Sequence, residues 1–215
     1  MFDLHRHTEF SLFDGHGKAE NLAKVAKENG LTALGISDHG TVSGLIQHYF
    51  ACKEEGIKPI LGCECYYQKE FVQDVKSYHL CLFDKNVQGY RNLNKIVTIA
   101  KNHEGLICST ACIASIFDQR IANGNVDAAK TELKRFKGLF GNDFYIEIQP
   151  YSIDTETTQQ SVNEVLLDLA GKLNIPCILT SDSHYGKKDE IDTIVKMHQI
   201  AKHEGIDIVQ TYGER

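Results

Sequence analysis

Short apolar runs alternate along the chain with segments whose apolar residues recur at helical spacing. Short apolar runs are typical of strands that are buried in a sheet. The sequence predicts seven of them: Phe2 to Leu4, Ala33 to Ser37, Pro59 to Cys65, Tyr78 to Phe83, Leu106 to Ser109, Phe144 to Gln149 and Cys177 to Ser181.

The segments between these runs have the pattern of amphipathic helices, and most of them end near a glycine, which commonly terminates a helix. A last helix is expected over residues 189–204. The predicted apolar stripes are Leu22, Val25 and Ala26 before Gly30; Leu45, Ile46, Tyr49 and Phe50 before Gly56; Tyr90, Leu93, Ile96, Val97 and Ala100 before Gly105; Leu133, Phe136 and Phe140 before Gly141; and Val162, Val165, Leu166 and Leu169 before Asn174.

A strand followed by a helix, repeated about seven times, predicts an α/β fold with a parallel sheet. The number of repeats favours a closed or nearly closed barrel over an open sheet. The chain has no linker rich in proline, glycine or serine and no low-complexity tract. We therefore expect a single domain over residues 1–215.

The charge of the chain limits how it could bind nucleic acid. A formal net charge of -6 argues against a surface coated with lysine and arginine that grips DNA non-specifically. A cluster of carboxylates that holds cations would contribute to such a charge, and the bound cations would attract phosphate. A phosphorylated substrate therefore remains compatible with the composition.

The seven cysteines lie mostly within apolar runs, which indicates reduced, buried thiols rather than a secreted disulfide framework. The N-terminus does not read as a signal peptide, and no apolar run approaches membrane-spanning length. We expect a soluble, cytoplasmic protein with no membrane segment.

Two histidines one residue apart follow the first predicted strand. Residues two apart on a strand point to the same face, so His5 and His7 can direct two imidazoles into one space, while Arg6 points elsewhere. On its own this pair is a weak signal, because such histidines can be ordinary surface or core residues. Its weight depends on whether other strand ends supply more ligands.

Other predicted strands supply further candidate ligands. These residues lie where the strands end and the loops to the helices begin, which is where barrel enzymes have their active sites. Their side chains are of the types that bind Zn²⁺, Mn²⁺ or Fe²⁺, so the sequence predicts a metal site at these strand ends. The candidates are Asp38 and His39 after the second strand, Glu64 at the end of the third, His79 in the fourth, Cys112 after the fifth, and Asp182 and His184 after the seventh.

Several polar residues have a second interpretation. Cys63 and Cys65 resemble a metal-binding pair, but on a strand Glu64 faces away from both, so only one of these sets can line the site. Asp38 could orient an imidazole or cap the helix that begins near Thr41. His16 is ambiguous and is left out of the site. Four histidines lie within or at the ends of predicted helices, and we interpret them as ordinary solvated or helix-terminal residues: His48, His103, His198 and His203.

The motifs of the chain resemble, in order and over nearly its whole length, those of the PHP (polymerase and histidinol phosphatase) domain family. The version at the N-terminus of the bacterial DNA polymerase III alpha subunit is the most similar. The segments that carry the resemblance are LHRHTEFSLFDG, GISDHGTVSG, KPILGCECYY, HLCLFDKNVQGYRNL, GLICSTACIAS and TSDSHY.

This resemblance implies a distorted (β/α)7 barrel with two to three divalent ions, which would be Zn²⁺, Mn²⁺ or Fe²⁺. Cys112 departs from the family pattern, because Ala111 stands where the polymerase version commonly has glycine. Glu64, His39, Asp182 and His184 would take part most directly in catalysis. The implied ligands are His5, His7, Glu64 and Asp182 for one ion; Glu64, His79 and Cys112 for a second; and Asp14, His39 and His184 for a third.

The resemblance also implies a function. It points to a metal-dependent phosphoesterase, and specifically to a 3'-5' exonuclease that acts on single-stranded 3' ends of DNA and is associated with a polymerase catalytic subunit. A non-catalytic scaffold of a polymerase is the main alternative, and a small-molecule phosphatase of the histidinol phosphatase type is another. A general amidohydrolase ranks lower, because the fourth strand carries His79 and no nearby lysine.

Overall fold

The computed structural model describes residues 2–12, 14–68, 77–96, 104–149, 158–184 and 196. In this part of the chain the strands follow one another in the sheet in sequence order, as expected for the predicted barrel. The strands are β1 (Phe2–Asp3), β2 (Ala33–Ile36), β3 (Lys58–Tyr67), β4 (Tyr78–Asp84), β5 (Leu106–Ser109), β6 (Phe144–Ile148) and β7 (Cys177–Leu179). The helices are α1 (Ala19–Glu28), α2 (Leu45–Glu54), α3 (Val87–Ile96), α4 (Ile116–Ala122), α5 (Val126–Phe140), the short 3-10 helix η1 (Gly141–Asp143) and α6 (Thr158–Leu173).

The chain packs as two compact units. The first unit comprises Met1–Cys63 and Asp182–Arg215, and the second comprises Glu64–Ser181. That the whole chain is one domain stays a prediction. None of the described helices is both long and apolar enough to cross a membrane.

In the first unit, β1 pairs in parallel with β2, and β2 with β3. Helices α1 and α2 pack against each other, and the buried residues Leu22, Leu34 and Cys52 belong to one core cluster. Gly35 of β2 lies so close to β1 that a Cβ there would come within 2.6 Å of the Leu4 carbonyl oxygen. Glycine therefore permits the close approach of the strand that precedes His5.

Helix α2 presents a different face to the core from the one predicted. Leu45 is buried as expected, but Ile46 and Phe50 are 55% and 60% exposed. The buried face instead includes His48, whose ring Nε2 donates a hydrogen bond to the Leu34 carbonyl oxygen over 2.9 Å. The interpretation of His48 as a solvated histidine was therefore wrong, because this hydrogen bond lets the polar ring be buried.

In the second unit, β5 pairs in parallel with β6 and β6 with β7, but β4 runs antiparallel to β5. The prediction of a wholly parallel sheet was wrong for β4. The reversal has a consequence for the site. Cys81 pairs with Ser109 at the end of β5, so His79, near the start of β4, lies at the same edge as the residues that follow β5.

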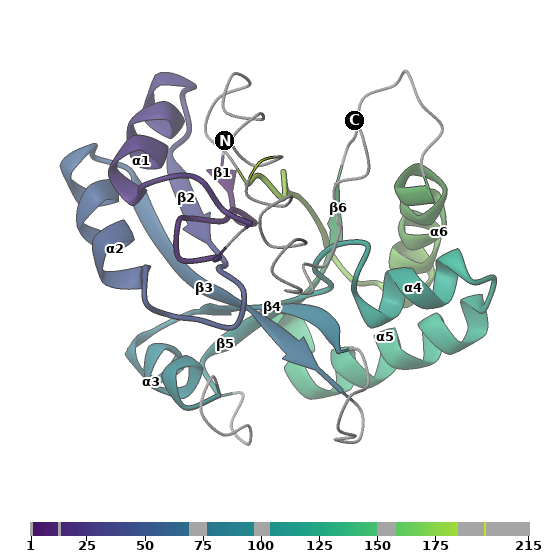
Figure 1. Ribbon diagram of the computed structural model, residues 1–215. Coiled ribbons are helices and arrows are strands. Elements are labelled where there is room, and N and C mark those ends of the chain that lie inside the picture. Colours follow the sequence, from purple (N-terminus) through teal and green to yellow (C-terminus); the bar gives the residue numbers. More distant parts are fainter. Residues whose placement is uncertain are drawn as a thin grey trace. The chain divides into compact units, whose positions relative to one another are not determined.

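Helices α4, α5 and α6 pack together in the second unit (Figure 1). Phe117 of α4, Phe136 of α5 and Phe144 of β6 form an aromatic cluster. The sequence did not predict α4. The feature of the sequence that marks the start of α4 is Ser115, whose side chain accepts a hydrogen bond from the Asp118 backbone N–H and caps the helix. Of the predicted last helix, residues 189–204, only residue 196 is described, and the histidines His103, His198 and His203 lie outside the described residues.

We expect His48 to make folding sensitive to acid. Desolvation by burial lowers the pKa of His48 from 6.5 to about 4, although the hydrogen bond to Leu34 opposes the shift. Below pH 6.5 the unfolded chain binds more protons at this residue than the folded protein. Its contribution to stability is therefore complete above pH 6.5 and falls as the pH drops toward 4, by up to roughly 3 kcal/mol.

Denaturant unfolding at a series of pH values measures this effect. The His48→Gln variant, whose amide can still donate to the Leu34 carbonyl, should lose this part of the pH dependence. His16→Gln replaces an exposed histidine and serves as the control, which should keep the wild-type slope. Identical slopes for wild type and His48→Gln would contradict the assignment.

Candidate metal centre

The ends of β1 and β7 bring four of the predicted ligands of the first unit to one side. Arg6 and Ser183 form an isolated parallel bridge, with hydrogen bonds from the His7 N–H to the Ser183 carbonyl and from the Ser183 N–H to the His5 carbonyl. Residues that flank a bridged pair point to the opposite face from the pair itself. His5 and His7 therefore share a side with the two residues that flank Ser183, which are Asp182 and His184.

A tight loop after β1 carries the acidic residue of this group. The N–H groups of Asp14 and Gly15 both donate to the Ser11 carbonyl oxygen. A Cβ at Gly15 would lie only 1.9 Å from the Thr8 carbonyl oxygen, so only glycine fits at this point. The loop places one carboxylate oxygen of Asp14 at 2.8 Å from Nε2 of His39 and 3.1 Å from Nε2 of His184.

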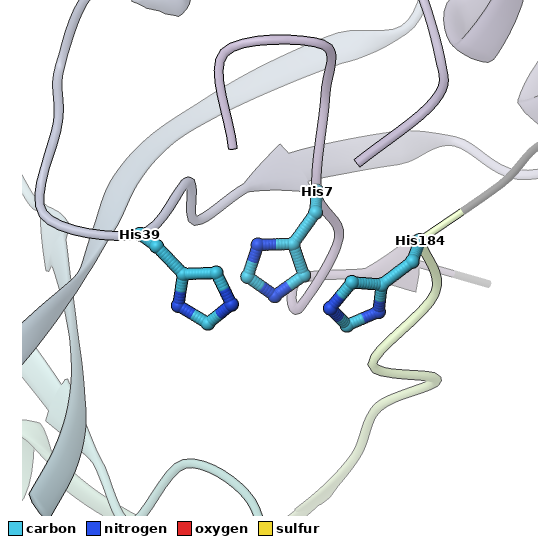
Figure 2. Close-up of side chains that lie close together, drawn as sticks. All are labelled: His7, His39 and His184. Carbon is cyan, nitrogen blue, oxygen red and sulfur yellow. The ribbon is translucent and has the colours of Figure 1, made fainter. Parts of the chain in front are cut away.

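Three imidazoles converge next to this carboxylate. His7 lies between His39 and His184 in Figure 2, with ring centroids 4.3 Å and 4.1 Å from theirs. One nitrogen of each ring lies within 4.8 Å of the others. On its other side, His7 joins a second group, in which Oδ1 of Asp182 lies 3.2 Å from Nε2 of His5 and 3.4 Å from Nε2 of His7.

A buried relay fixes the tautomer of His7. The Ser11 hydroxyl donates its proton to Asp38 over 2.9 Å, so its oxygen can only accept from its other neighbours. These are the His39 backbone N–H at 3.1 Å and Nδ1 of His7 at 3.0 Å. Nδ1 of His7 therefore carries a proton. In neutral His7, the lone pair is on Nε2, the nitrogen that faces Asp182.

Asp38 is the buried anchor of this relay. Its two carboxylate oxygens also accept from the Thr8 backbone N–H and the Thr8 hydroxyl, each over 2.7 Å. Burial raises the pKa of Asp38 above its ordinary value, and the hydrogen bonds from Thr8 and Ser11 oppose that shift. Asp38 does not cap α2, whose N-cap Gly44 has no side-chain cap bond. It acts on His7 through Ser11, which the sequence analysis did not single out.

His184 is held in the same tautomer by a different acceptor. Its Nδ1 lies 3.0 Å from the Asp182 carbonyl oxygen, which can only accept, so Nδ1 carries a proton. Nε2 then faces the Asp14 carboxylate, which is also an acceptor when ionised. His7 and His184 thus have oxygen acceptors on both sides of the ring. Such a ring needs either a second proton or a cation between Nε2 and the carboxylate.

A divalent cation is the better fit. A cation can accept the Nε2 lone pair of a neutral ring and also attract the carboxylate that faces it. A Zn²⁺ ion with bonds of about 2.0–2.1 Å holds tetrahedral donors about 3.3 Å apart. The distances from Asp14 to His184, 3.1 Å, and from Asp182 to His5 and His7, 3.2 Å and 3.4 Å, are close to that value, whereas the 2.8 Å from Asp14 to His39 is shorter. Imidazole and carboxylate donors also suit Mn²⁺ and Fe²⁺.

The second unit contributes the donors Glu64, His79 and Cys112, all buried. Nδ1 of His79 lies 2.8 Å from Oε1 of Glu64, and the Cys112 sulfur lies 3.5 Å from each of these two atoms. A zinc ion bound by one thiolate and one imidazole separates the two donors by about 3.5 Å. These three side chains therefore also fit a metal ion.

The nine predicted ligands thus fall into two sets, one in each unit. The first unit brings together His5, His7, Asp14, His39, Asp182 and His184, and the second brings together Glu64, His79 and Cys112. A shared role of Glu64 in two ions stays a prediction. His16 has an exposed side chain, and Cys63 is buried with its thiol 3.4 Å from the Asp38 carbonyl oxygen.

Comparison with known proteins decides the family. Residues 3–151 match the model of the PHP domain. The chain belongs to the PHP domain family.

Two relatives of this PHP domain are DNA polymerase III alpha subunits. Those of Borreliella burgdorferi and Aquifex aeolicus are each 36% identical to it over 211 residues, which is 87% and 85% of this chain. The chain spans only 18% of the length of either subunit. A solved amidohydrolase from Chromobacterium violaceum, with bound sulfate and no metal, has a TM-score of 0.50 and 14% identity. That likeness covers 91% of this chain and 96% of the other and shows the fold alone.

We expect Ser11→Ala to weaken metal binding while the domain stays folded. The change removes the acceptor that holds Nδ1 of His7 and with it the preference for a lone pair on Nε2. Removing a residue that orients a ligand typically weakens metal affinity by about 10–100-fold. Titration with Zn²⁺ against a competing chelator measures the loss. Ser43→Ala, in an exposed turn, is the control and should keep wild-type affinity. Equal affinity in all three proteins would contradict the relay.

Proposed function

We propose that this PHP domain is a metal-dependent phosphoesterase that removes nucleotides from the 3' ends of single-stranded DNA. The observation that carries the proposal is the arrangement of buried imidazoles and carboxylates, in which His7 and His184 face oxygen acceptors on both sides. Burying such groups without a cation is costly, so their clustering favours a site built to hold one.

The residues would hold two to three ions of Zn²⁺, Mn²⁺ or Fe²⁺. His5, His7 and Asp182 would hold one ion, with Glu64 as a further ligand; Glu64, His79 and Cys112 would hold another; and Asp14, His39 and His184 a third. When bound, such ions supply a hydroxide from water near neutral pH and neutralise charge on the phosphate oxygens.

The protein's own contribution is to fix donors and protons in advance. The relay from Asp38 through Ser11 holds a proton on Nδ1 of His7, and the Asp182 carbonyl does the same for His184. Both rings therefore present the Nε2 lone pair to a cation without a change of tautomer. The burial of these side chains keeps bulk water from competing for them.

DNA is the proposed substrate because the relatives are subunits of DNA polymerases. Since the net charge is -6, bound ions would have to supply much of the attraction for the phosphate backbone. A polymerase catalytic subunit is the proposed partner. A scaffold without activity and a small-molecule phosphatase are the alternatives that an assay must separate.

With Mn²⁺ present, we expect the protein to shorten single-stranded DNA stepwise from a free 3' end, and a chelator to stop it. Asp182→Asn should reduce the rate at least about 100-fold, because it removes the carboxylate charge opposite His5 and His7. The domain should stay folded, since Asp182 has a φ of 50° and asparagine also tolerates that backbone conformation. Denaturing gels of end-labelled DNA measure the products.

Asp168→Asn is the matched control, because Asp168 is an exposed residue that pairs with Lys172 on α6. It should cleave at the wild-type rate. If the protein hydrolysed phosphate monoesters but not DNA, the exonuclease proposal would be wrong, and a small-molecule phosphatase would be the better assignment. If the metal-loaded protein hydrolysed neither DNA, RNA nor phosphate monoesters, the enzyme proposal would be wrong, and the non-catalytic scaffold would be the remaining alternative.

A further inference from the structure

A buried carboxylate outside the predicted ligand sets joins three strands of the second unit. Glu147, in β6, is 1% exposed. Its Oε1 accepts a hydrogen bond from the Ser109 hydroxyl, and its Oε2 accepts one from the Thr180 hydroxyl over 2.8 Å. Its backbone N–H donates to the Thr110 hydroxyl over 3.0 Å. One side chain thus ties the end of β5 to the residue that follows β7.

Both tied segments lead directly to a proposed metal ligand. Ser109 ends β5 and lies three residues before Cys112, and Thr180 lies two residues before Asp182. Each segment contains a non-glycine residue in the left-handed region, Ala111 at φ 61° and Asp182 at φ 50°. Such residues cost about 1–3 kcal/mol each and persist only where surrounding contacts hold them.

We propose that Glu147 is a positioning residue for both sets of proposed ligands, because it holds these two segments in the backbone conformation that presents Cys112 in one set and Asp182 in the other. The inference rests on the proposed metal-dependent function. It accounts for a buried acidic side chain whose two oxygens each fix one of these segments, where an apolar residue would leave both hydroxyls without this acceptor.

A merely structural role would predict something different. In that case Glu147 would stabilise the fold like any buried, hydrogen-bonded side chain, without special influence on metal binding. Glu132 offers the comparison within the same unit. It is a buried glutamate on α5 whose carboxylate accepts from Arg135 of the same helix over 2.8 Å. Its contacts are with Arg135 and Arg120, neither of which lies in a segment that carries a proposed ligand.

The test is titration of the metal-free protein with Co²⁺, whose bond to the Cys112 thiolate gives a charge-transfer absorption in the near ultraviolet. Glu147→Ala should weaken this Co²⁺ binding by roughly tenfold or more. Glu147→Gln should largely keep it, because the amide can accept from one hydroxyl and donate to the other. Glu132→Ala should lower the melting temperature and leave the affinity unchanged.

Two single-anchor variants keep the test decisive if Glu147→Ala does not fold. Ser109→Ala and Thr180→Val each remove one hydroxyl, and each should weaken Co²⁺ binding, with Ser109→Ala reducing the Cys112 absorption more. Wild-type affinity in Glu147→Ala, or in both anchor variants, would overturn the proposal. So would a loss of affinity in Glu132→Ala equal to that in Glu147→Ala, or a wild-type protein without Co²⁺–thiolate absorption.

Failure of the phosphoesterase proposal can be recognised separately. A wild-type protein that binds Co²⁺ through Cys112 but hydrolyses no phosphate ester would reject the enzyme. If Glu147→Ala then still weakened Co²⁺ binding, the positioning role would stand without it.

Discussion

The site in the first unit depends on the placement of oxygen acceptors on both sides of two imidazole rings. Ser11 and the Asp182 carbonyl fix a proton on Nδ1 of His7 and His184, and the carboxylates of Asp182 and Asp14 lie beyond Nε2. A neutral ring cannot satisfy two acceptors with one proton. The two rings are stacked about 4 Å apart, and a divalent cation, which accepts a nitrogen lone pair and attracts a carboxylate, is the species that these contacts are suited to hold.

The fold delivers these groups because strand ends converge. The bridge between Arg6 and Ser183 sets the register that puts His5 and His7 on the same side as Asp182 and His184. In the second unit the reversal of β4 matters as much. It allows His79, near the start of β4, to contact Cys112, which follows the end of β5. The loops that complete each set are held by buried polar contacts, from Asp38 in one unit and Glu147 in the other.

The parts of the molecule that the sequence predicted well are those governed by local pattern. The strand positions follow from short apolar runs, and the His5–His7 pair follows from the two-residue period of a strand. The direction of β4 could not be predicted in this way, because an apolar run indicates a buried strand but not whether that strand is parallel or antiparallel to its neighbour. The face of α2 was predicted wrongly, because one tertiary hydrogen bond from His48 to Leu34 makes burial of a polar ring favourable. Ser11 was missed for a similar reason, as its role exists only once Asp38 lies beside it.

Histidine tautomers measured by long-range ¹H–¹⁵N NMR, with and without one equivalent of Zn²⁺ for each site, test the central claim most directly. Our account predicts that His7 and His184 keep a proton on Nδ1 throughout, and that Zn²⁺ shifts only the Nε2 resonance of each ring. Rings that carry the proton on Nε2, or Nε2 resonances that do not respond to Zn²⁺, would contradict it.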